Sequence, residues 1–279
     1  KKLHLFGRYG ITIFAISAVD IALWDIVAKH SNLPLCNLLG SVGEKKLPAY
    51  ASLWRYEDAE AVQDRCQYAK NLGYKYIKLH EVFTSEVKAA RNILGDDIPI
   101  MVDTNCPWTK DEARQMLNSW EEYSLYWVEE PINPPEDFES LSNLRADTFI
   151  PIAAGENACT SFEFKKMFDA EAVDYAQPSV TKVGGITEFK KINHLADTYG
   201  VQVMPHSPYF GPGFLATLHL AQSMPNPGLL ERFFIDFEAY LYPKEIFTPQ
   251  DGFFKTPDTI GLGLDPDKDV IKDFAVKTL

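Results

Sequence analysis

From about residue 47 onward, short apolar runs alternate with longer segments in which apolar residues recur every three or four positions. The short runs predict eight strands, which in chain order span residues 47–53, 74–80, 98–103, 125–130, 149–154, 172–177, 201–205 and 228–233. The segments between them predict helices, and several end at a Gly that suits a helix C-terminus. Eight strands separated by helices are the pattern of a (β/α)8 barrel.

The segments that flank this repeat predict how the chain begins and ends. Residues 14–40 predict an amphipathic helix followed by a turn that contains Pro34. Residues 241–279 are rich in Pro, Gly and Asp, and they predict a tail on the outside of the barrel. No linker divides the chain. We therefore predict a barrel with a leading helix over residues 1–240 and a C-terminal tail over residues 241–279.

The composition narrows the class of protein. The chain has 279 residues, of which 46% are hydrophobic and 24% charged, and these values are typical of a globular protein. Its formal net charge of −12 argues against nucleic acid or an anionic membrane as a partner. The four cysteines lack metal-binding spacing, and neither a signal peptide nor an uninterrupted apolar run of about 20 residues is evident. These features predict a cytoplasmic protein.

Three acidic residues follow three successive predicted strands. Asp103, Glu129 and Glu156 lie 26 and 27 residues apart, which is about the length of one strand, one helix and two loops. Catalytic residues of such barrels lie at the carboxyl ends of the strands, so these acids should converge there. Three converging carboxylates repel one another unless a cation lies between them. Oxygen ligands without Cys or His favour Mg²⁺, and we predict one Mg²⁺ site.

Basic residues at other strand ends predict acid–base chemistry. Lys78 and His80 are two residues apart on the second strand and therefore point to the same side. Their proximity is expected to lower the pKa of both, which would give a base that works near neutral pH. His206 follows the seventh strand, on the opposite side of the ring. The two histidines could thus remove a proton from one face of a substrate and deliver one to the other.

Further polar and aromatic residues lie at the strand ends as candidates for supporting roles. They are Asn105, Ser179, Glu231 and, as the aromatic residue best placed to touch a substrate, Trp54. Glu231 could act on the substrate or simply pair with Arg232 or another cation. Glu130, the neighbour of Glu129, is an alternative metal ligand.

Seven short motifs together resemble the enolase superfamily, and more narrowly its mandelate racemase and muconate lactonizing branch. They are AVDIALWDIVAK, IKLH, VDTN, WVEEP, GEN, KVGGIT and PHSP. The resemblance implies a modified barrel, usually preceded by an α+β capping domain. It implies that Asp103, Glu129 and Glu156 bind Mg²⁺, in preference to Glu130. It also implies abstraction of a proton α to a carboxylate, with the resulting enediolate stabilised by the metal.

Three departures from the family pattern affect what the resemblance implies. The second strand commonly reads Lys-x-Lys, so His80 here occupies the position of the base. Ser179 stands where many relatives have an Asp that pairs with the His of strand seven, so His206 is expected to be a weaker base that still serves as an acid. Only a short segment precedes the first predicted helix, so this sequence is expected to lack most of the capping domain.

These features predict a lyase that dehydrates a hydroxylated carboxylic acid, such as an acid sugar. Lys78, His80 and His206 are its predicted catalytic residues. The alternatives are a racemase or epimerase that uses the same two histidines, and a non-catalytic metal-binding barrel. A cycloisomerase is less favoured, because nothing in the sequence indicates a diene acid substrate. The expected partner is a small carboxylate, and assembly into a homo-oligomer would be usual for such a barrel.

Overall fold

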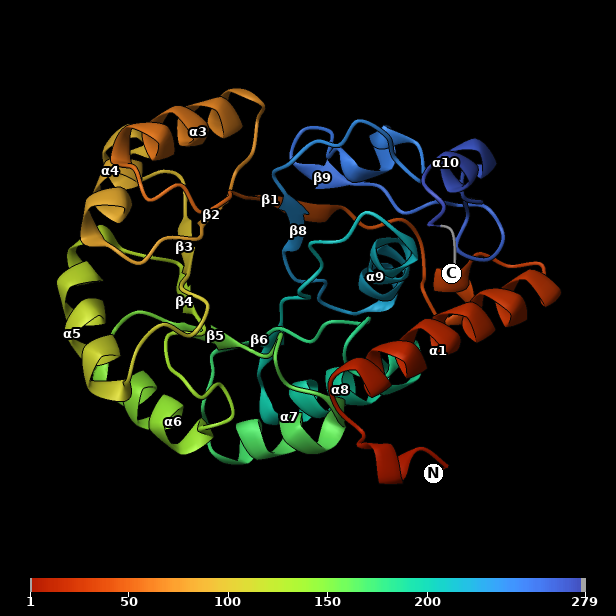
Figure 1. The fold of residues 1–279 in the computed structure, drawn as a ribbon, viewed down its shortest axis with the longest axis horizontal. Helices are drawn as coiled ribbons and strands as arrows, with labels where there is room; N and C mark the ends of the chain where they lie inside the picture. The colour runs from red at the N-terminus through yellow and green to blue at the C-terminus, as the bar shows by residue number, and fades with distance from the viewer. Residues whose placement is uncertain (1, 277–279) are drawn as a thin grey trace.

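The computed structural model of the chain describes residues 2–276, and its strands lie inside an arc of helices (Figure 1). Residue 1 of the predicted barrel and residues 277–279 of the predicted tail lie outside the described residues. The strands are β1 (Leu47–Ser52), β2 (Ile77–Leu79), β3 (Ile100–Asp103), β4 (Trp127–Glu129), β5 (Ile152–Ala154), β6 (Tyr175–Ala176), β7 (Gln202–Val203), β8 (Leu230–Phe233) and β9 (Phe253–Phe254). The α-helices are α1 (Ile11–His30), α2 (Leu35–Leu38), α3 (Ala59–Asn71), α4 (Thr84–Leu94), α5 (Lys110–Trp120), α6 (Phe138–Asp147), α7 (Thr160–Asp169), α8 (Gly185–Tyr199), α9 (Pro212–Ser223) and α10 (Lys268–Asp273). Short 3-10 helices are η1 (His4–Phe6), η2 (Glu121–Tyr123) and η3 (Lys244–Phe247).

Eight strands form one curled parallel sheet in the order β7-β6-β5-β4-β3-β2-β1-β8. From β1 to β7 each strand therefore pairs with the next one in the chain, and β8 returns to pair with β1. Within residues 2–276 no hydrogen-bonded ladder joins β7 to β8. The two strands meet instead where the backbone N–H of Leu229 donates to the sulfur of Met204 at 3.1 Å. The prediction of a (β/α)8-type barrel is confirmed.

The strands are shorter than the apolar runs that predicted them. β6 and β7 have only two residues each, because β6 joins the ladder only at Tyr175 and β7 leaves it after Val203. The sequence also missed β9, which pairs antiparallel with the start of β1 through Leu47 and Phe254. Two residues are too few to give an alternating pattern.

Alternation along the strands separates two apolar cores. Side chains from one side of the strands fill the inside of the barrel, and they comprise Tyr50, Met101, Trp127, Ala153, Met204 and Leu229. Those from the other side join the helices in a larger outer core, which includes Ile77, Val102 and Val128. Because inner residues recur every second position, the next inward position after Met101 is Asp103 and after Trp127 is Glu129. The inner core thus ends where the polar residues of the strand ends begin.

Side-chain caps fix where several barrel helices begin. α5 begins with a capping box in which the hydroxyl of Thr109 accepts from the backbone N–H of Glu112 at 3.4 Å. The carboxylate of Glu112 in turn accepts from the backbone N–H of Thr109 at 2.8 Å. Asp58 and Asp137 cap α3 and α6 in a similar way. Such caps satisfy amide groups that the first turn leaves without partners.

The leading helix α1 lies outside the barrel and binds α8. Thr187 donates its backbone N–H to Asp20 at 3.0 Å, and Trp24 donates its indole N–H to the hydroxyl of Thr187 at 2.9 Å. By length and composition alone α1 could also span a membrane, although its apolar run is interrupted by Asp20 and Asp25. In the folded chain both acids are hydrogen-bonded, Asp25 to the backbone N–H of Leu262 at 2.7 Å.

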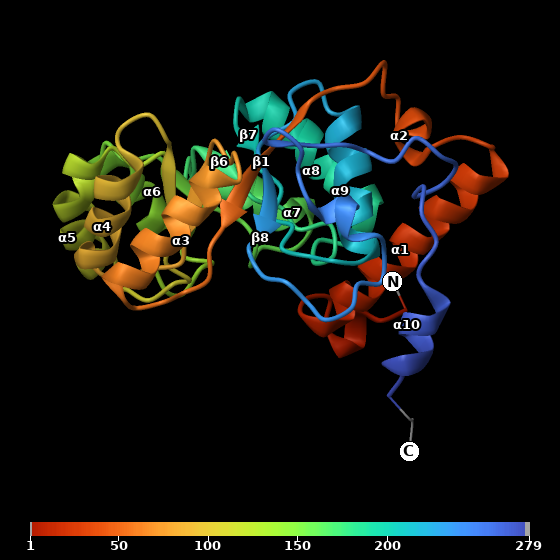
Figure 2. The ribbon, with the colours of Figure 1, turned by 90° about the horizontal axis from the view of Figure 1, so that it is seen from above.

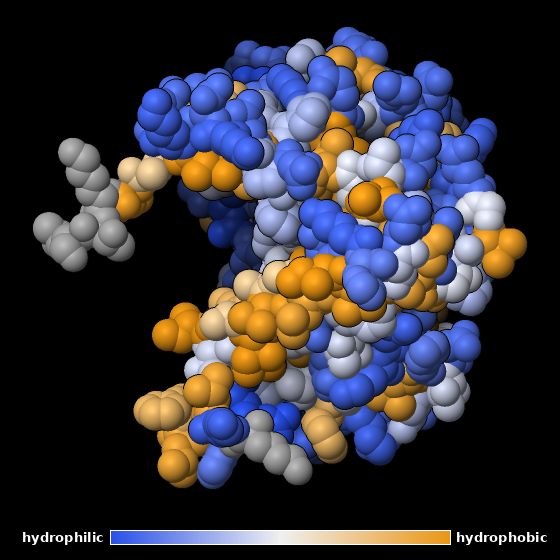
Figure 3. Space-filling view, turned by 90° about the vertical axis from the view of Figure 1, so that its right-hand side faces the viewer, coloured by the Kyte–Doolittle hydropathy of each residue, from blue (hydrophilic) through white to orange (hydrophobic). Residues whose placement is uncertain are grey.

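The prediction that α1 is amphipathic is wrong. Only a narrow side of the helix is buried, and Val19, Leu23 and Ile26 on another side are 61%, 55% and 60% exposed. Hydrophobic side chains gather on the face of the molecule to which α1 belongs (Figure 3). α1 is therefore apolar on both its packed and its exposed sides.

The C-terminal segment returns to the C-terminal half of the leading helix before it reaches α10, and Figure 2 shows it passing close to the end of α1. The backbone of Gly261 donates to the carbonyl of Leu33 at 3.0 Å and accepts from the N–H of Leu35 at 2.8 Å. Lys29 of α1 forms an ion pair with Asp265 at 3.4 Å. The end of α1 and the turn after it are thus bound to the segment around Gly261 outside the barrel.

Candidate active site

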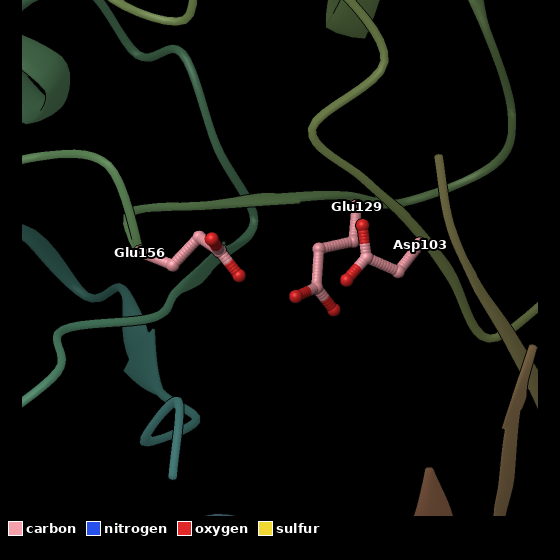
Figure 4. Close-up of side chains that lie close together, drawn as sticks. All are labelled: Asp103, Glu129 and Glu156. Carbon is pink, nitrogen blue, oxygen red and sulfur yellow. The ribbon is translucent and has the colours of Figure 1, made fainter. Parts of the chain in front are cut away.

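The three acids that the sequence singled out converge at the carboxyl ends of β3, β4 and β5. Asp103 and Glu129 are register partners at the last positions of β3 and β4, and Glu156 lies two residues beyond β5. One oxygen of each carboxylate lies within 4.8 Å of the other two (Figure 4). Asp103 and Glu129 are buried, and the side chain of Glu156 is 16% exposed. At this separation each pair of charges repels by roughly 3 kcal/mol at an effective dielectric constant of about 20, so a counter-charge is required.

The loop after β3 holds Asp103 in one orientation. Asn105 has a φ of +56°, in the left-handed region that non-glycine residues seldom adopt. This conformation turns its backbone N–H toward the Oδ1 of Asp103 at 3.0 Å, and its side-chain amide donates to the same oxygen at 2.9 Å. The second oxygen, Oδ2, is left to face the centre of the site. On β4, the indole N–H of Trp127 donates to Glu129 at 3.1 Å.

The ammonium group of Lys78 neutralises part of the negative charge. It lies fully buried, 3.1 Å from Glu129, 3.4 Å from Asp103 and 3.3 Å from Glu231. Burial alone would lower the pKa of Lys78, but Glu129 and Glu231 outweigh it and raise that pKa well above its usual value. Lys78 is therefore a fixed positive charge.

His80 is held in a single tautomer by the backbone. Its Nδ1 lies 2.5 Å from the carbonyl oxygen of Leu53, which can only accept, so Nδ1 carries the proton. Its Nε2 faces the Oδ2 of Asp103 at 3.2 Å. Burial alone would lower the pKa of His80, but the hydrogen bond to Asp103 raises it above its usual value. The prediction that Lys78 and His80 lower each other's pKa is therefore wrong in its net result, because nearby carboxylates outweigh the repulsion between the two cations.

His206, after β7, contacts the other end of the acid cluster. Its Nε2 lies 2.8 Å from the Oε2 of Glu156, and its Nδ1 lies 3.1 Å from the hydroxyl of Ser179. Ser179 also donates to the backbone carbonyl of His206 at 3.2 Å and is hydrogen-bonded to the hydroxyl of Tyr209. Burial alone would lower the pKa of His206, and Glu156 raises it above its usual value. Glu156 thus places beside His206 a negative charge that Ser179 cannot provide, and the weakening of His206 as a base stays a prediction.

The remaining carboxylates respond to their different neighbours. Burial and the charge of Asp103 raise the pKa of Glu129 to about 7. Burial acts in the same direction on Glu156, but His206 outweighs it and lowers that pKa to about 2. Burial also opposes ionisation of Asp103, and Lys78 and His80 nevertheless hold the pKa of Asp103 well below its usual value. Glu129, which has no histidine partner, therefore has the highest pKa of the three acids.

Glu231 on β8 is part of the same site. It accepts from the hydroxyl of Ser52 at 2.7 Å and from the backbone N–H of Ser207 at 3.1 Å. Burial would raise the pKa of Glu231, but Lys78 outweighs it and lowers that pKa. Of the two roles left open by the sequence, pairing with a cation is confirmed, and the cation is Lys78 rather than Arg232.

Trp54 and His80 line a depression of about 470 Å³ at the barrel mouth, together with Arg55, Asn105 and Phe233 among others. Trp54 is 54% exposed, and its ring lies 5.5 Å from that of Phe233. An exposed indole beside a polar site offers a surface on which the C–H face of a small molecule can stack.

Three residues that contact the site were missed by sequence reasoning. Arg55 donates to the carbonyl of His80 at 2.7 Å and to Asn105 at 3.1 Å. Lys182 forms an ion pair with Glu156 at 3.4 Å, and Tyr209 binds Ser179. Arg55 directly follows Trp54, and Lys182 belongs to the KVGGIT segment, so position alone could have identified these two.

The donor set suits a hard divalent cation. The described residues hold one group of three potential metal ligands, which offers only carboxylate oxygens from three adjacent strand ends. Glu130 is not part of it, so the alternative of Glu130 as the second ligand is not supported. Oxygen-only ligands at this spacing fit Mg²⁺ better than Zn²⁺ or copper.

Comparison with known families places the site in a wider context. Residues 60–270 match the family model described as enolase C-terminal domain-like. Residues 2–40 match the model of the mandelate racemase / muconate lactonizing enzyme N-terminal domain. The first of these matches covers more than half of the chain.

Individual relatives agree with the family models. The chain is 33% identical to an arabinonate dehydratase of Saccharolobus solfataricus, over 100% of this chain and 76% of the relative. It is 33% identical to an L-talarate/galactarate dehydratase of Salmonella typhimurium, over 92% of this chain but only 64% of the relative.

Among solved structures, the 3,6-anhydro-D-galactonate cycloisomerase of Zobellia galactanivorans superimposes with a TM-score of 0.90 at 33% identity. The match covers 99% of this chain and 79% of that one. The motifs, the barrel with its three strand-end acids, and these matches agree. The chain belongs to the enolase superfamily, in the branch of mandelate racemase and muconate lactonizing enzyme.

Proposed function

We propose that this protein is a Mg²⁺-dependent lyase that dehydrates a hydroxylated carboxylic acid, and that its substrate is an acid sugar. The observation that carries the proposal is the row of side chains His80, Asp103, Glu129, Glu156 and His206, in which a histidine contacts each end of the acid cluster. The relatives include acid-sugar dehydratases, which supports the choice of substrate class.

In this proposal Asp103, Glu129 and Glu156 hold one Mg²⁺ ion per chain. When bound, the ion supplies positive charge that stabilises the substrate carboxylate as the α-proton leaves. Lys78 places a second positive charge beside Glu129 and Glu231. The site thus favours the build-up of negative charge on the substrate.

The two histidines divide the proton transfers between them. The carbonyl of Leu53 fixes one proton of His80 on Nδ1, so neutral His80 would accept the α-proton at Nε2, the nitrogen that faces Asp103. His206 then donates a proton from Nε2 to the β-hydroxyl, which leaves as water. The enol product rearranges to a 2-keto acid. Trp54 and Asn105 border the depression next to His80 and are proposed to contact the rest of the substrate.

The test is incubation with Mg²⁺ and a panel of acid sugars in D₂O, with 2-keto acid and α-deuterium measured by NMR. We expect 2-keto acid from at least one substrate. His80→Gln should abolish both product and α-exchange, because it removes the base. His206→Asn should keep α-exchange but lose the product by at least 10²-fold, because only the acid is removed.

Other outcomes would support other functions. Deuterium at the α-carbon without loss of hydroxyl would indicate a racemase or epimerase. Neither exchange nor product from any substrate, together with Mg²⁺ binding, would indicate a non-catalytic barrel. Cycloisomerisation is a further candidate, because two cycloisomerases match 94% and 99% of the chain. It would produce an isomer of the same mass without release of water.

We also propose the setting in which the enzyme works. The four cysteines are free, which supports a cytoplasmic location, and a small carboxylate is its proposed partner. We propose that the tail over residues 241–279 packs against a capping domain, and that chains assemble as homo-oligomers. The contacts of Leu33 and Leu35 with Gly261 hold the described part of this tail beside α1, which supports that role.

A further inference from the structure

Glu130 has no part in the chemistry proposed above, yet it lies among the loops that carry all three acids. It follows Glu129 directly, is 4% exposed and has a φ of +47°. Left-handed backbone is costly for a residue with a side chain, so surrounding contacts must hold it there. Those contacts come from the loops on both sides of β4.

One oxygen of Glu130 joins the two neighbouring loops. Its Oε2 accepts from the side-chain amide of Asn157 at 2.7 Å and from the thiol of Cys106 at 3.3 Å. Asn157 is the residue directly after Glu156, and Cys106 lies three residues after Asp103. A single carboxylate therefore connects the residues next to all three acids.

Backbone contacts reinforce the connection on the side of β3. The N–H of Cys106 donates to the carbonyl of Glu130 at 2.7 Å, and the hydroxyl of Thr104 donates to the same carbonyl at 3.0 Å. Cys106, like Asn105, is left-handed, with a φ of +56°. On the side of β5 the backbone N–H of Glu130 donates to the carbonyl of Ala153 at 3.0 Å, inside the strand. Among the described residues, the hydrogen bond from Glu130 to Asn157 in the loop beyond β5 is made by the carboxylate.

We propose that Glu130 is a positioning residue whose carboxylate clamps the loops after β3 and β5 onto β4, so that Asp103, Glu129 and Glu156 keep the spacing of a Mg²⁺ site. The proposal rests on the Mg²⁺ site of the proposed function. Without the clamp, three mutually repelling carboxylates would separate, and the metal would have to reassemble them on binding. Residues that orient metal ligands in this way typically change metal affinity by about 10- to 100-fold.

The experiment measures Mg²⁺ affinity of the whole chain by titration calorimetry, without substrate. We expect Glu130→Ala to weaken binding by about 10- to 100-fold. Glu130→Gln should bind within about threefold of the unaltered protein, because an amide oxygen can accept the same two hydrogen bonds. Glu136→Gln is the control, since Glu136 lines the same 320 Å³ pocket as Glu130, and among the described residues its carboxylate makes no hydrogen bond or ion pair with the loops that carry the three acids.

Asn157→Ala provides a second route in case Glu130→Ala does not fold. Asn157 is exposed, so its truncation should leave the fold intact and still weaken Mg²⁺ binding. The double variant Glu130→Ala, Asn157→Ala should bind Mg²⁺ no more weakly than Glu130→Ala alone, because both changes remove the same hydrogen bond. Unchanged affinity in Glu130→Ala or Asn157→Ala, or equal loss in Glu130→Gln and Glu130→Ala, would overturn the clamp. Absence of Mg²⁺ binding by the unaltered protein would instead overturn the proposed function.

Discussion

His219 shows how the fold controls the charge of a single residue. It lies in the middle of α9, fully buried, where its Nδ1 accepts from the backbone N–H of Cys36 at 3.1 Å. Burial lowers the pKa of His219 to about 4. The residue is therefore neutral in the folded protein at any pH above about 4, whereas in the unfolded chain it takes up a proton below about pH 6.5.

This difference predicts how stability depends on pH. The contribution of His219 is complete above pH 6.5 and is lost as the pH falls from about 6.5 to about 4, because only the unfolded chain binds the proton in that window. The free energy of unfolding should fall by up to about 3 kcal/mol from this source. Urea unfolding at a series of pH values should give a steeper decline for the unaltered protein than for His219→Gln. Parallel curves would contradict the prediction.

Residues of the site differ in how far the sequence could predict them. Asp103, Glu129 and Glu156 were predicted correctly as a cluster, because the carboxyl ends of parallel strands must share one edge. The raised pKa of His80 was not predicted. It depends on Asp103, which is remote in the sequence and contacts His80 only after the chain has folded. The side chains that hold the loops, such as Arg55 and Glu130, lie outside the regular strand pattern, and no alternation indicates their direction.

At the scale of elements, the helices show which signals are local. α5 begins at a capping box made by Thr109 and Glu112, a pattern that is contained in four consecutive residues. Strand positions were predicted by apolar runs, but the point at which each strand leaves the ladder depends on its neighbour. β6 and β7 were therefore overestimated in length, and β9 was missed.

The capping box gives a prediction for α5. Thr109→Ala removes the hydroxyl that accepts from Glu112, and it should cost about 1 kcal/mol of stability. We expect the midpoint of thermal unfolding to fall by about 2 °C, measured by circular dichroism. Thr109→Ser retains the hydroxyl and should unfold close to the unaltered protein. Mg²⁺ affinity should not change, and a large change would mean that α5 also positions Asp103.

At the scale of the whole molecule, the exposed side of α1 is the largest departure from what the sequence predicted. The periodic apolar pattern indicated a helix with one buried face, and it could not reveal that α8 covers only part of it. Val19, Leu23 and Ile26 follow one another at intervals of four and three residues, and so form one apolar stripe. Apolar patches of this kind usually contact another protein surface.

This stripe predicts that the chain self-associates. The triple variant Val19→Gln, Leu23→Gln, Ile26→Gln should sediment as a smaller species than the unaltered protein at the same concentration. Glu139→Gln, on the exposed side of α6, is the control and should have no effect. If the unaltered chain is already monomeric at about 100 µM, well above the micromolar range of weak association, the prediction fails.

The pairing of β1 with both β2 and β8 has a consequence for synthesis of the chain. One edge of β1 pairs with β2, which follows within about 30 residues. The other edge pairs with β8 (Leu230–Phe233), which is synthesised roughly 180 residues later. Gly261, which binds Leu33 and Leu35, follows later still. While the ribosome is still adding the second half of the barrel, β1 carries an unpaired edge that can recruit other strands. Protection of the nascent chain by a chaperone would therefore be needed longest at the strand that is made first.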